Sequence, residues 1–459
     1  MLVILQFEVL PADAQVEQLK NAGITLLDYV PHNAYTAVVS TAMDAALLMQ
    51  VRVRSLTEMK AADKMLPALS AGIFPPHAVK VPGTIDVWVS FPRTSTFETV
   101  SKELQKRNFD IQSSVFKQQR IIALCISNWR LMELASLPFI EYVEAAPGED
   151  QLLNTYSRTS SRANILNKPI SSGGRNLRGD GIVIGIGDNS DPIHVDFTGR
   201  KISRAGIEPN YHGTHVHGTA GGAGIWNELY TGYAPKATLL SQVFTGVWVN
   251  APTYYTDHRM VITNNSYGAI TQDCSYSGFY DSYARILDAQ AISLPKVFNT
   301  FAAGNSGIGF PINCSPFPAG YKTVLGGYQS AKNVLTVGNT FADGVIFSQS
   351  SRGPVKDGRL KPEITAQGAF VTSTAIPQDY LQNTGTSMAN PAVAGGLALL
   401  YQRYRQLNGP ATDPDNGLMK AIVCNTATDK GNTGPDYIYG FGWLNLLRAI
   451  EVLEAGNYT

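Results

Sequence analysis

The stretch Ile182-Val-Ile-Gly-Ile-Gly-Asp188 decides the fold of the larger part of the chain. Its apolar residues do not alternate with polar ones, which is typical of a strand buried on both faces. Similar runs follow, separated by glycine-rich turns and helical stretches, at residues 237–243, 261–265, 297–303 and 334–337. Buried strands that alternate with helices predict an α/β domain over residues 155–459, with a doubly wound parallel sheet flanked by helices.

The first 147 residues follow a different pattern, in which the order strand, helix, strand, strand, helix, strand occurs twice. We place the first copy at residues 1–70 and the second at residues 83–147, with a Gly/Pro-rich stretch at 72–82 between them. This order predicts two α+β modules of the split βαβ, ferredoxin-like kind. Residue identity between the copies is low, so the duplication rests on the pattern alone.

Length and charge exclude several classes of protein. A chain of 459 residues predicts at least two hydrophobic cores. Lysine plus arginine equals aspartate plus glutamate at 36 each, so there is no basic excess for binding nucleic acid. We expect no membrane span, because no run reaches about 18 apolar residues. The first eight residues lack the basic start of a signal peptide.

The cysteines leave two interpretations open. None lies in a C-x-x-C pair, which argues against a zinc or thioredoxin-like site; they are Cys125, Cys274, Cys314 and Cys424. They are either buried unpaired thiols or include a bridge between Cys274 and Cys314, in two loop-rich segments of the same domain. Spacing alone does not decide between these.

Two candidate catalytic side chains lie at predicted element ends. Asp188 ends its strand at the edge where open α/β sheets bind their ligands. His212 begins the stretch His212-Gly-Thr-His-Val-His-Gly-Thr219. Zinc sites on one helix favour histidines four residues apart with an acidic partner, a spacing that these histidines lack, so we expect no metal here. For His215 and His217 we expect packing or hydrogen bonding.

A third candidate lies in Gly385-Thr-Ser-Met-Ala-Asn-Pro391, which precedes apolar residues at helical spacing. Pro391 fits the first turn of a helix, so Ser387 is predicted at the helix amino end. Unpaired N–H groups there favour a developing negative charge. Taken alone, an aspartate at a strand end such as Asp188 is more often a turn residue, and a serine at a helix start such as Ser387 is more often a helix cap.

Together the three stretches resemble the catalytic motifs of the subtilisin-like serine proteases, the subtilase family. The matching stretches are Asp188, His212-Gly-Thr-His-Val and Gly385-Thr-Ser-Met-Ala-x-Pro, in the chain order of that family. The α/β-hydrolases would instead need G-x-S-x-G around the serine. The resemblance covers about residues 155–450.

The chain departs from the family pattern at two places. Asn189 and Ser190 stand where the family usually has Thr or Ser and then Gly, which leaves the local turn open. His217 stands where a small residue is common, so its helix is expected to have an unusual neighbour there.

The resemblance implies a serine endopeptidase, a hydrolase of peptide bonds. Ser387 would attack the scissile carbonyl, His212 would take up its proton and Asp188 would orient the imidazole. Because the base must be neutral, activity is expected to fall as the pH drops. The Asn305 side chain and the backbone N–H of Ser387 would bind the oxyanion. The residues expected to bind substrate are Ser266, Tyr267, Gly268, Ala303 and Gly304.

Members of this family are typically made as zymogens whose amino-terminal pro-domain blocks the active site. The module at 83–147 would be the inhibitory one, with its trailing segment 146–155 in the cleft. Processing by the enzyme itself would then fall between Ala146 and Arg162. The alternative is that residues 1–147 form a permanent accessory domain.

Partners and cofactors follow from the same resemblance. We expect polypeptide substrates, the chain's own pro-region as an intramolecular inhibitor, and no cofactor for catalysis. Structural calcium is common in the family, and Thr412–Gly417 offers oxygen ligands, although such a stretch is usually only a turn. We expect a secreted or cell-surface protein of bacterial type, although this chain has no signal peptide. The alternative function is a catalytically silent, self-inhibited binding or assembly protein with the same fold.

Overall fold

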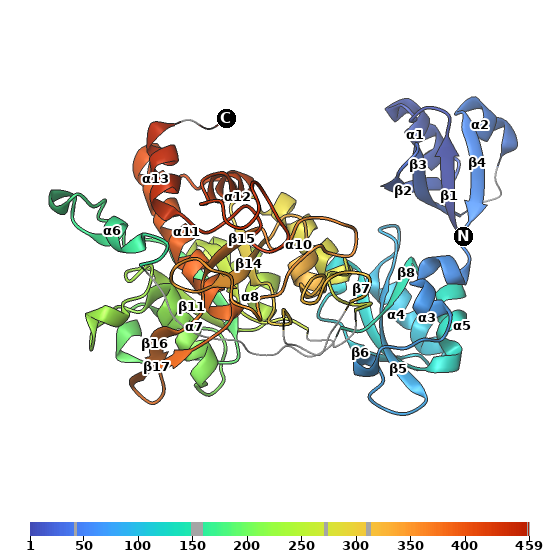
Figure 1. Cartoon of the computed structure of the whole chain (residues 1–459). Coiled ribbons are helices and arrows are strands. Elements are labelled where there is room, and N and C mark those ends of the chain that lie inside the picture. Colours follow the sequence, from blue (N-terminus) through green and yellow to red (C-terminus); the bar gives the residue numbers. More distant parts are fainter. Residues whose placement is uncertain (41–43, 148–158, 270–273, 309–313, 457, 459) are drawn as a thin grey trace. The chain divides into compact units, whose positions relative to one another are not determined.

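The computed structural model describes residues 1–40, 44–147, 159–269, 274–308, 314–456 and 458 (Figure 1). They belong to two compact units, residues 1–148 and residues 149–459. Each unit has its own sheets and its own core, and each is described separately.

The first unit begins with an antiparallel four-stranded sheet in the order β2-β3-β1-β4, covered by two helices. Its core contains Val3, Leu5 and Phe7, the inward residues of β1, packed with Leu19 of α1. Its elements are β1 (Leu2–Phe7), α1 (Asp13–Asn21), β2 (Ile24–Val30), β3 (Ala34–Val39), α2 (Ala45–Gln50) and β4 (Val53–Glu58).

The second sheet of this unit repeats the arrangement, with strand order β6-β7-β5-β8. In both sheets the first strand lies between the third and the fourth, which is the ferredoxin-like order. Its elements are β5 (Thr84–Ser90), α4 (Phe97–Lys106), β6 (Asp110–Ser113), η3 (Lys117–Gln119), β7 (Ile121–Ser127), η4 (Asn128–Arg130), α5 (Leu131–Ser136) and β8 (Tyr142–Ala145).

The boundary between the two modules lies earlier than the predicted residue 70. Lys64 donates a hydrogen bond from Nζ to the carbonyl of Leu137 at 3.0 Å, and Met65 forms a bridge with Val143. The segment after Glu58 therefore packs with the second sheet. The short helices of this connection are η1 (Ala61–Lys64), α3 (Pro67–Ser70) and η2 (Pro76–Ala78).

The second unit is built on a seven-stranded parallel sheet, in the order β10-β11-β9-β12-β13-β14-β15. Along β9, Ile184 and Ile186 belong to the main core, whereas Gly185 and Gly187 face Val247 on the other side. The sheet is thus covered by helices on both faces, and the predicted fold class is confirmed. Its strands are β9 (Val183–Asp188), β10 (Lys201–Ser203), β11 (Thr238–Val243), β12 (Met260–Asn265), β13 (Phe298–Ala302), β14 (Leu335–Thr340) and β15 (Ile364–Gln367).

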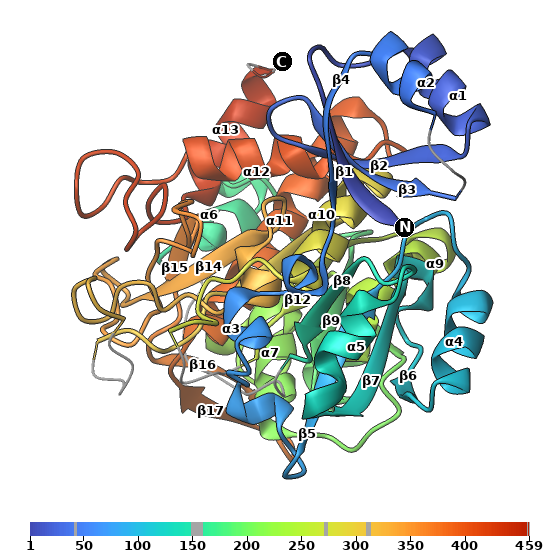
Figure 2. The same ribbon diagram turned by 90° about the vertical axis from the view of Figure 1, so that its right-hand side faces the viewer.

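Helices and a hairpin complete this unit, and Figure 2 shows α7 and α11 beside the sheet. The hairpin pairs β16 (Val371–Ala375) with β17 (Asp379–Asn383). The helices are α6 (Ala163–Asn167), α7 (Tyr211–Gly221), α8 (Gly246–Val249), α9 (Ala251–His258), α10 (Ser282–Ser293), α11 (Thr386–Asn408), α12 (Asn416–Asn425) and α13 (Leu446–Ala455). The short 3₁₀ turns are η5 (Ile170–Ser172), η6 (Val195–Phe197), η7 (Glu228–Tyr230) and η8 (Gly327–Ser330).

The predicted strand runs all correspond to strands of the sheet. The sequence analysis missed β10, β15 and the hairpin, because these segments are short and mix polar with apolar residues. Within the described residues, no helix is both long enough and apolar enough to span a membrane.

A buried ion cluster supports β14 and β15. Glu363 lies 2.7 Å from Lys361 Nζ and 2.6 Å from Lys420 Nζ, and its other oxygen accepts the N–H of Thr336 at 2.8 Å. Burial lowers the pKa of Lys361 to about 8, although the carboxylate beside it acts in the opposite direction. Burial would raise the pKa of Glu363, but the charges of the two lysines outweigh burial and hold it below its usual value.

We predict that Glu363→Gln destabilises the folded chain by about 3–5 kcal/mol, because it leaves Lys361 buried without a counter-ion. The measurement is urea unfolding at neutral pH, in a Ser387→Ala background that removes the expected nucleophile. Glu454→Gln is the matched control. Glu454 pairs with Arg175 and Arg403 but is 21% exposed, so a loss below about 1 kcal/mol is expected. Equal losses for both variants would contradict the prediction.

Candidate active site

The candidate site lies at the carboxyl edge of the parallel sheet, where β9, β12 and β13 end side by side. Asp188 is the last residue of β9, and Asn265 is the last residue of β12. His212 and Ser387 are each the second residue of a helix, in α7 and α11. The parallel sheet therefore collects side chains that are far apart in the sequence.

Asp188 and His212 form a buried pair. Their side chains, 0% and 1% exposed, approach to 2.7 Å between Asp188 Oδ1 and His212 Nδ1. With Nδ1–H as the donor to this carboxylate, Nε2 is the nitrogen left to act as a base. Asp188 Oδ1 also accepts the backbone N–H of Asn189 at 2.9 Å, which holds the carboxylate in place.

Two residues fix the start of α7: Ser190, which the sequence analysis noted only as a departure from the family pattern, and Asn210, which it did not mention. Asn210 caps the helix by accepting the N–H of His212 at 3.0 Å. Ser190 Oγ accepts the N–H of Asn210 at 2.9 Å and lies 3.3 Å from Thr214 Oγ1. A Cβ on Gly213 would lie 2.6 Å from that of Ser190. An asparagine two residues before the histidine is a readable capping signal, whereas the role of Ser190 depends on tertiary contacts.

The two other histidines of α7 are buried and hydrogen-bonded. His215 Nε2 lies 3.1 Å from the carbonyls of both Val371 and Leu381. His217 Nδ1 lies 2.6 Å from the carbonyl of Gly213, and Nε2 lies 2.8 Å from Ser241 Oγ. Burial lowers the pKa of His215 to about 3 and the pKa of His217 to about 4. In the described part of the chain, no three His, Cys, Asp or Glu residues gather as they would around a metal ion.

Ser387 is joined to Ser266 by two reciprocal hydrogen bonds. Ser387 Oγ donates to the carbonyl of Ser266 at 2.7 Å, and Ser266 Oγ donates to the carbonyl of Ser387 at 2.9 Å. The second bond is open to Ser266 because Pro391, four residues on, has no N–H to bond that carbonyl. The prediction that Pro391 lies in the first helical turn was wrong. Pro391 lies inside α11, which begins at Thr386.

The hydroxyl of Ser387 is thus directed at a backbone carbonyl. Within the described residues no hydrogen bond joins Ser387 to His212. Rotation about the Cα–Cβ bond would be needed to pass the proton to the imidazole. Catalytic hydrogen bonds are often incomplete without substrate, so this geometry is compatible with the expected roles.

Asn305 is oriented by the residue before Ser387. Its Oδ1 accepts both the N–H and the Oγ1–H of Thr386, each at 3.0 Å, and Thr386 Oγ1 accepts the N–H of Gly304 at 3.2 Å. The amide Nδ2 of Asn305 therefore faces away from Thr386 and remains a donor. The N–H of Ser387 lies in the first turn of α11, where N–H groups have no intrahelical partner.

The segment Ser266–Gly268 is held rigidly by the core beneath it. Tyr267 is fully buried, and its hydroxyl donates to Asn265 Oδ1 at 2.8 Å and accepts the indole N–H of Trp248 at 3.1 Å. Gln329 Nε2 donates to the Tyr267 carbonyl at 2.8 Å. The Tyr267 side chain is thus part of the core, and only its backbone can face a substrate.

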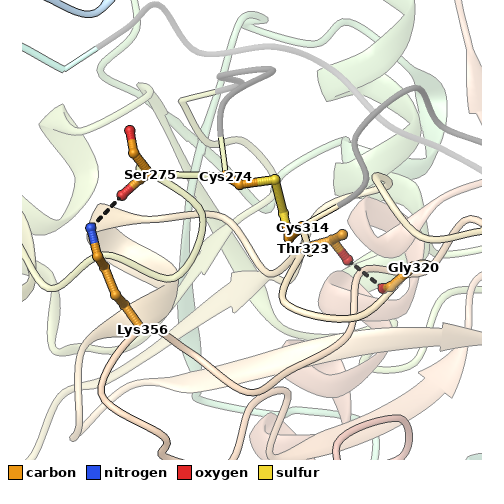
Figure 3. Close-up of a disulfide and its surroundings, with 6 residues drawn as sticks. All are labelled: Cys274, Ser275, Cys314, Gly320, Thr323 and Lys356. Atoms are coloured by element: carbon orange, nitrogen blue, oxygen red, sulfur yellow. Dashed lines mark hydrogen bonds between the residues drawn. A yellow bond between two sulfur atoms is a disulfide. The ribbon is translucent and has the colours of Figure 1, made fainter. Parts of the chain in front are cut away.

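A disulfide joins Cys274 to Cys314 (Figure 3). It joins a residue that follows Gly268 in the chain to a residue that follows Asn305. Of the two interpretations of the cysteines, the bridge between Cys274 and Cys314 is therefore the correct one. Cys125 and Cys424 are unpaired thiols.

The stretch Thr412–Gly417 does not fit a calcium ion. Asp413 lies 2.6 Å from Arg405 and 3.1 Å from Arg259, and Asp415 lies 2.8 Å from Lys296. These carboxylates therefore neutralise cationic side chains of this unit. Residues 148–158 lie outside the described residues. They include most of the expected inhibitory tail, residues 146–155, and most of the expected processing region between Ala146 and Arg162.

Comparison with known proteins agrees with this geometry. Residues 179–442, more than half of the chain, match the model of the Subtilase family, so the chain belongs to this family of serine peptidases. Residues 1–60 match a family described as a domain of unknown function (DUF8729).

Two curated relatives differ in how much of their length the chain covers. Serine protease AprX of Bacillus subtilis (strain 168) is 30% identical over 325 residues, which cover 61% of this chain and 68% of that protein. Tripeptidyl-peptidase 2 of Oryza sativa subsp. japonica is 31% identical over 263 residues, which cover 53% of this chain and 18% of that protein.

Among solved structures, the fold is similar to that of fervidolysin from Fervidobacterium pennivorans, described as a keratinolytic enzyme related to subtilisin. The TM-score is 0.56 at 20% identity, over 80% of this chain and 60% of that one. The Clostridium perfringens CspB protease has a TM-score of 0.54 at 17% identity, over 66% of this chain and 98% of that one.

We predict that the free energy of unfolding falls as the pH drops below 6.5, which is the ordinary pKa of a histidine such as His215 or His217. The unfolded chain binds protons at His215 and His217 below that pH, whereas the folded chain does so only near pH 3 and 4. Unfolding therefore takes up protons, and this contribution is complete above pH 6.5 and lost on acidification, by up to about 2.7 kcal/mol per pH unit.

The measurement is urea unfolding of the Ser387→Ala chain between pH 7 and pH 4. His217→Gln is expected to remove about half of the pH slope that these two groups contribute. Asn408→Ala, at an exposed position without a titrating side chain, is the control and is expected to leave the slope unchanged. An unchanged slope for His217→Gln would show that His217 is not held neutral in the fold.

Proposed function

We propose that this chain is a serine endopeptidase that hydrolyses peptide bonds through Ser387, His212 and Asp188. The observation that carries the proposal is the buried 2.7 Å pair of Asp188 and His212, at the sheet edge where Ser387 begins α11. Membership of a peptidase family whose relatives include a protein named as a serine protease supports it. Polypeptides are the proposed substrates.

The reaction begins when the Ser387 hydroxyl breaks its hydrogen bond to the carbonyl of Ser266, rotates and passes its proton to His212 Nε2. Ser387 Oγ then forms a bond to the scissile carbonyl carbon, and the carbonyl oxygen becomes an oxyanion. The Nδ2 donor of Asn305 and the N–H of Ser387 stabilise that oxyanion, and Asp188 stabilises the imidazolium.

Breakdown of this tetrahedral intermediate completes the cycle. The scissile C–N bond breaks as His212 returns the proton to the leaving amine, which leaves an acyl ester on Ser387. A water molecule then gives a proton to His212 and attacks the ester, so the acid product departs and Ser387 regains its proton. The reaction needs no cofactor.

We further propose that the chain is a latent precursor. The two ferredoxin-like sheets before residue 148 support a pro-region, with the second as intramolecular inhibitor. Export to the cell exterior goes with this proposal, because precursors of this kind are usually secreted. The competing idea of a silent binding protein lacks support from the residues, since each expected triad residue is present.

We predict that purified wild-type chain incubated at neutral pH loses its pro-region by cleavage between Ala146 and Arg162, whereas Ser387→Ala stays whole. The reason is that only the wild type has a nucleophile. Intact mass and amino-terminal sequencing measure the outcome. If both chains stay whole, the latent-precursor proposal fails. Cleavage of both chains would instead indicate a contaminating protease.

Replacing Asn305 by alanine is predicted to lower kcat by about 10²–10³, with a much smaller change in KM, because an oxyanion donor acts in the transition state. The size of this effect is the one known for the oxyanion asparagine of a subtilisin. Steady-state kinetics on one peptide substrate measure it. Asn408→Ala, at the exposed end of α11, is the control and should leave both constants unchanged. A loss confined to KM would contradict the oxyanion role.

A further inference from the structure

His217 is a fully buried histidine of α7 that the proposed reaction does not use. Its Nδ1 lies 2.6 Å from the carbonyl of Gly213, and its Nε2 lies 2.8 Å from Ser241 Oγ. A carbonyl oxygen only accepts hydrogen bonds, so Nδ1 carries the proton and Nε2 accepts the Ser241 hydroxyl. One side chain thus joins α7 to β11 through both of its nitrogens. A small residue, common at this position in the family, would make neither bond.

Gly213 follows His212 directly and lies against Asp188. A Cβ on Gly213 would lie 3.0 Å from Asp188 Oδ1 and 2.6 Å from Ser190 Cβ, so any side chain here would displace one of them. Glycine also has more backbone freedom than other residues, which weakens a helix at that point. The bond from His217 to the Gly213 carbonyl therefore restrains the backbone where α7 meets Asp188.

The other end of this link lies on the strand beside Asp188. Ser241 is fully buried and pairs with Ile186 in the register of β11 and β9. Two residues further on, Val243 pairs with Asp188. The imidazole of His217 also packs against the buried ring of Phe197, at 6.0 Å between ring centroids. The link is therefore anchored in the packed sheet.

We propose that His217 is a positioning residue for the catalytic histidine. Its bonds to Gly213 and Ser241 hold the first turn of α7 against β9. This restraint keeps the hydrogen bond between His212 and Asp188 at 2.7 Å. Without the link, the imidazole of His212 would be oriented less accurately toward the nucleophile. The inference rests on the proposed peptidase function and adds to it a residue that acts through His212.

The first test replaces His217 by alanine. We expect kcat to fall about 10–100-fold, with KM changed by less than about two-fold, because misplacing a catalytic group by about 1 Å can cost about 10²-fold in rate. The measurement is steady-state kinetics on one peptide substrate, with the chain in whichever form is active and with active sites counted by a serine-directed phosphonate. An unchanged kcat, or a loss confined to KM, overturns the inference.

Two smaller changes separate the two bonds, and they serve even where the alanine variant does not fold. His217→Asn keeps an N–H group near the position of Nδ1, so it can bond Gly213 but is too short to reach Ser241. It should recover most of the kcat that His217→Ala loses. An asparagine variant no faster than the alanine variant contradicts the role of the Gly213 bond.

Ser241→Ala removes only the anchor on β11 and should also lower kcat. Adding it to His217→Ala should cause no further loss, because contacts within one network are not additive. An unchanged kcat in Ser241→Ala overturns the inference by itself. Losses that multiply in the double variant do the same.

A spectroscopic readout in the Ser387→Ala chain needs no catalysis. The proton in the short bond between His212 and Asp188 gives a low-field NMR resonance, identified by its loss in Asp188→Ala. His217→Ala should move this resonance to higher field, because the bond lengthens. Leu453→Ala truncates a buried side chain of α13 and should leave both the resonance and kcat unchanged. A resonance that stays in place in His217→Ala overturns the inference.

The two readouts keep this inference apart from the proposed function. If wild type and Ser387→Ala both cleave no peptide, the proposed function fails, and the resonance alone judges His217. If only Ser387→Ala is inactive, the proposed function holds, and the kinetics and the resonance together judge His217.

Discussion

The site depends on one constraint, that all strands of the large sheet run parallel. Because they do, β9, β12 and β13 end at the same edge, although their last residues are spread from Asp188 to Ala302. The helices α7 and α11 begin at that edge and bring His212 and Ser387 to it. The buried bond between Asp188 and His212 joins the end of one strand to the start of one helix. The chemistry thus follows from strand direction.

A layer of buried amides and hydroxyls holds this edge together. Asn390 Nδ2 donates to the carbonyl of Asn265 at 3.0 Å, and Asn265 Nδ2 donates to the carbonyl of Thr300 at 3.0 Å. Asn264 Nδ2 donates to Ser266 Oγ at 3.1 Å. The Nδ2 donors of these three amides are thus paired, and each of these contacts specifies its neighbour. They fix the backbone around Ser266 and Ser387, and the Ser387 hydroxyl donates to the carbonyl of Ser266 within this layer.

The amino-terminal unit repeats one topology with little shared sequence. Each sheet needs only a buried face, so many combinations of valine, isoleucine and leucine satisfy it. The first copy has its own family match, which ends at residue 60, close to the end of β4 at Glu58. The repeated topology of the two sheets supports the proposal of a pro-region. An intramolecular inhibitor would bind the active site through residues that follow the second sheet, and the topology does not identify these residues.

The sequence by itself determined the fold class and the residues expected to do the chemistry. Short uninterrupted apolar runs are typical of strands buried on both faces, and Asp188, His212 and Ser387 lie in motifs whose order is specific. Local signals of this kind need no knowledge of distant contacts. They failed for Pro391, because α11 begins at Thr386 and already includes the five residues before Pro391. They failed for the module boundary at residue 70, because Lys64 and Met65 pair with later segments.

Only the tertiary structure decided how these residues are held. The spacing of the cysteines could not predict the bridge between Cys274 and Cys314, because a loop-rich segment can contain either a free thiol or a disulfide. Nor could the sequence pattern show that Ser190 supports α7, that Asp413 pairs with Arg259, or that His217 bonds Ser241. Each of these contacts joins segments that are well separated along the chain. Their positions depend on the packed core, which a local pattern does not encode.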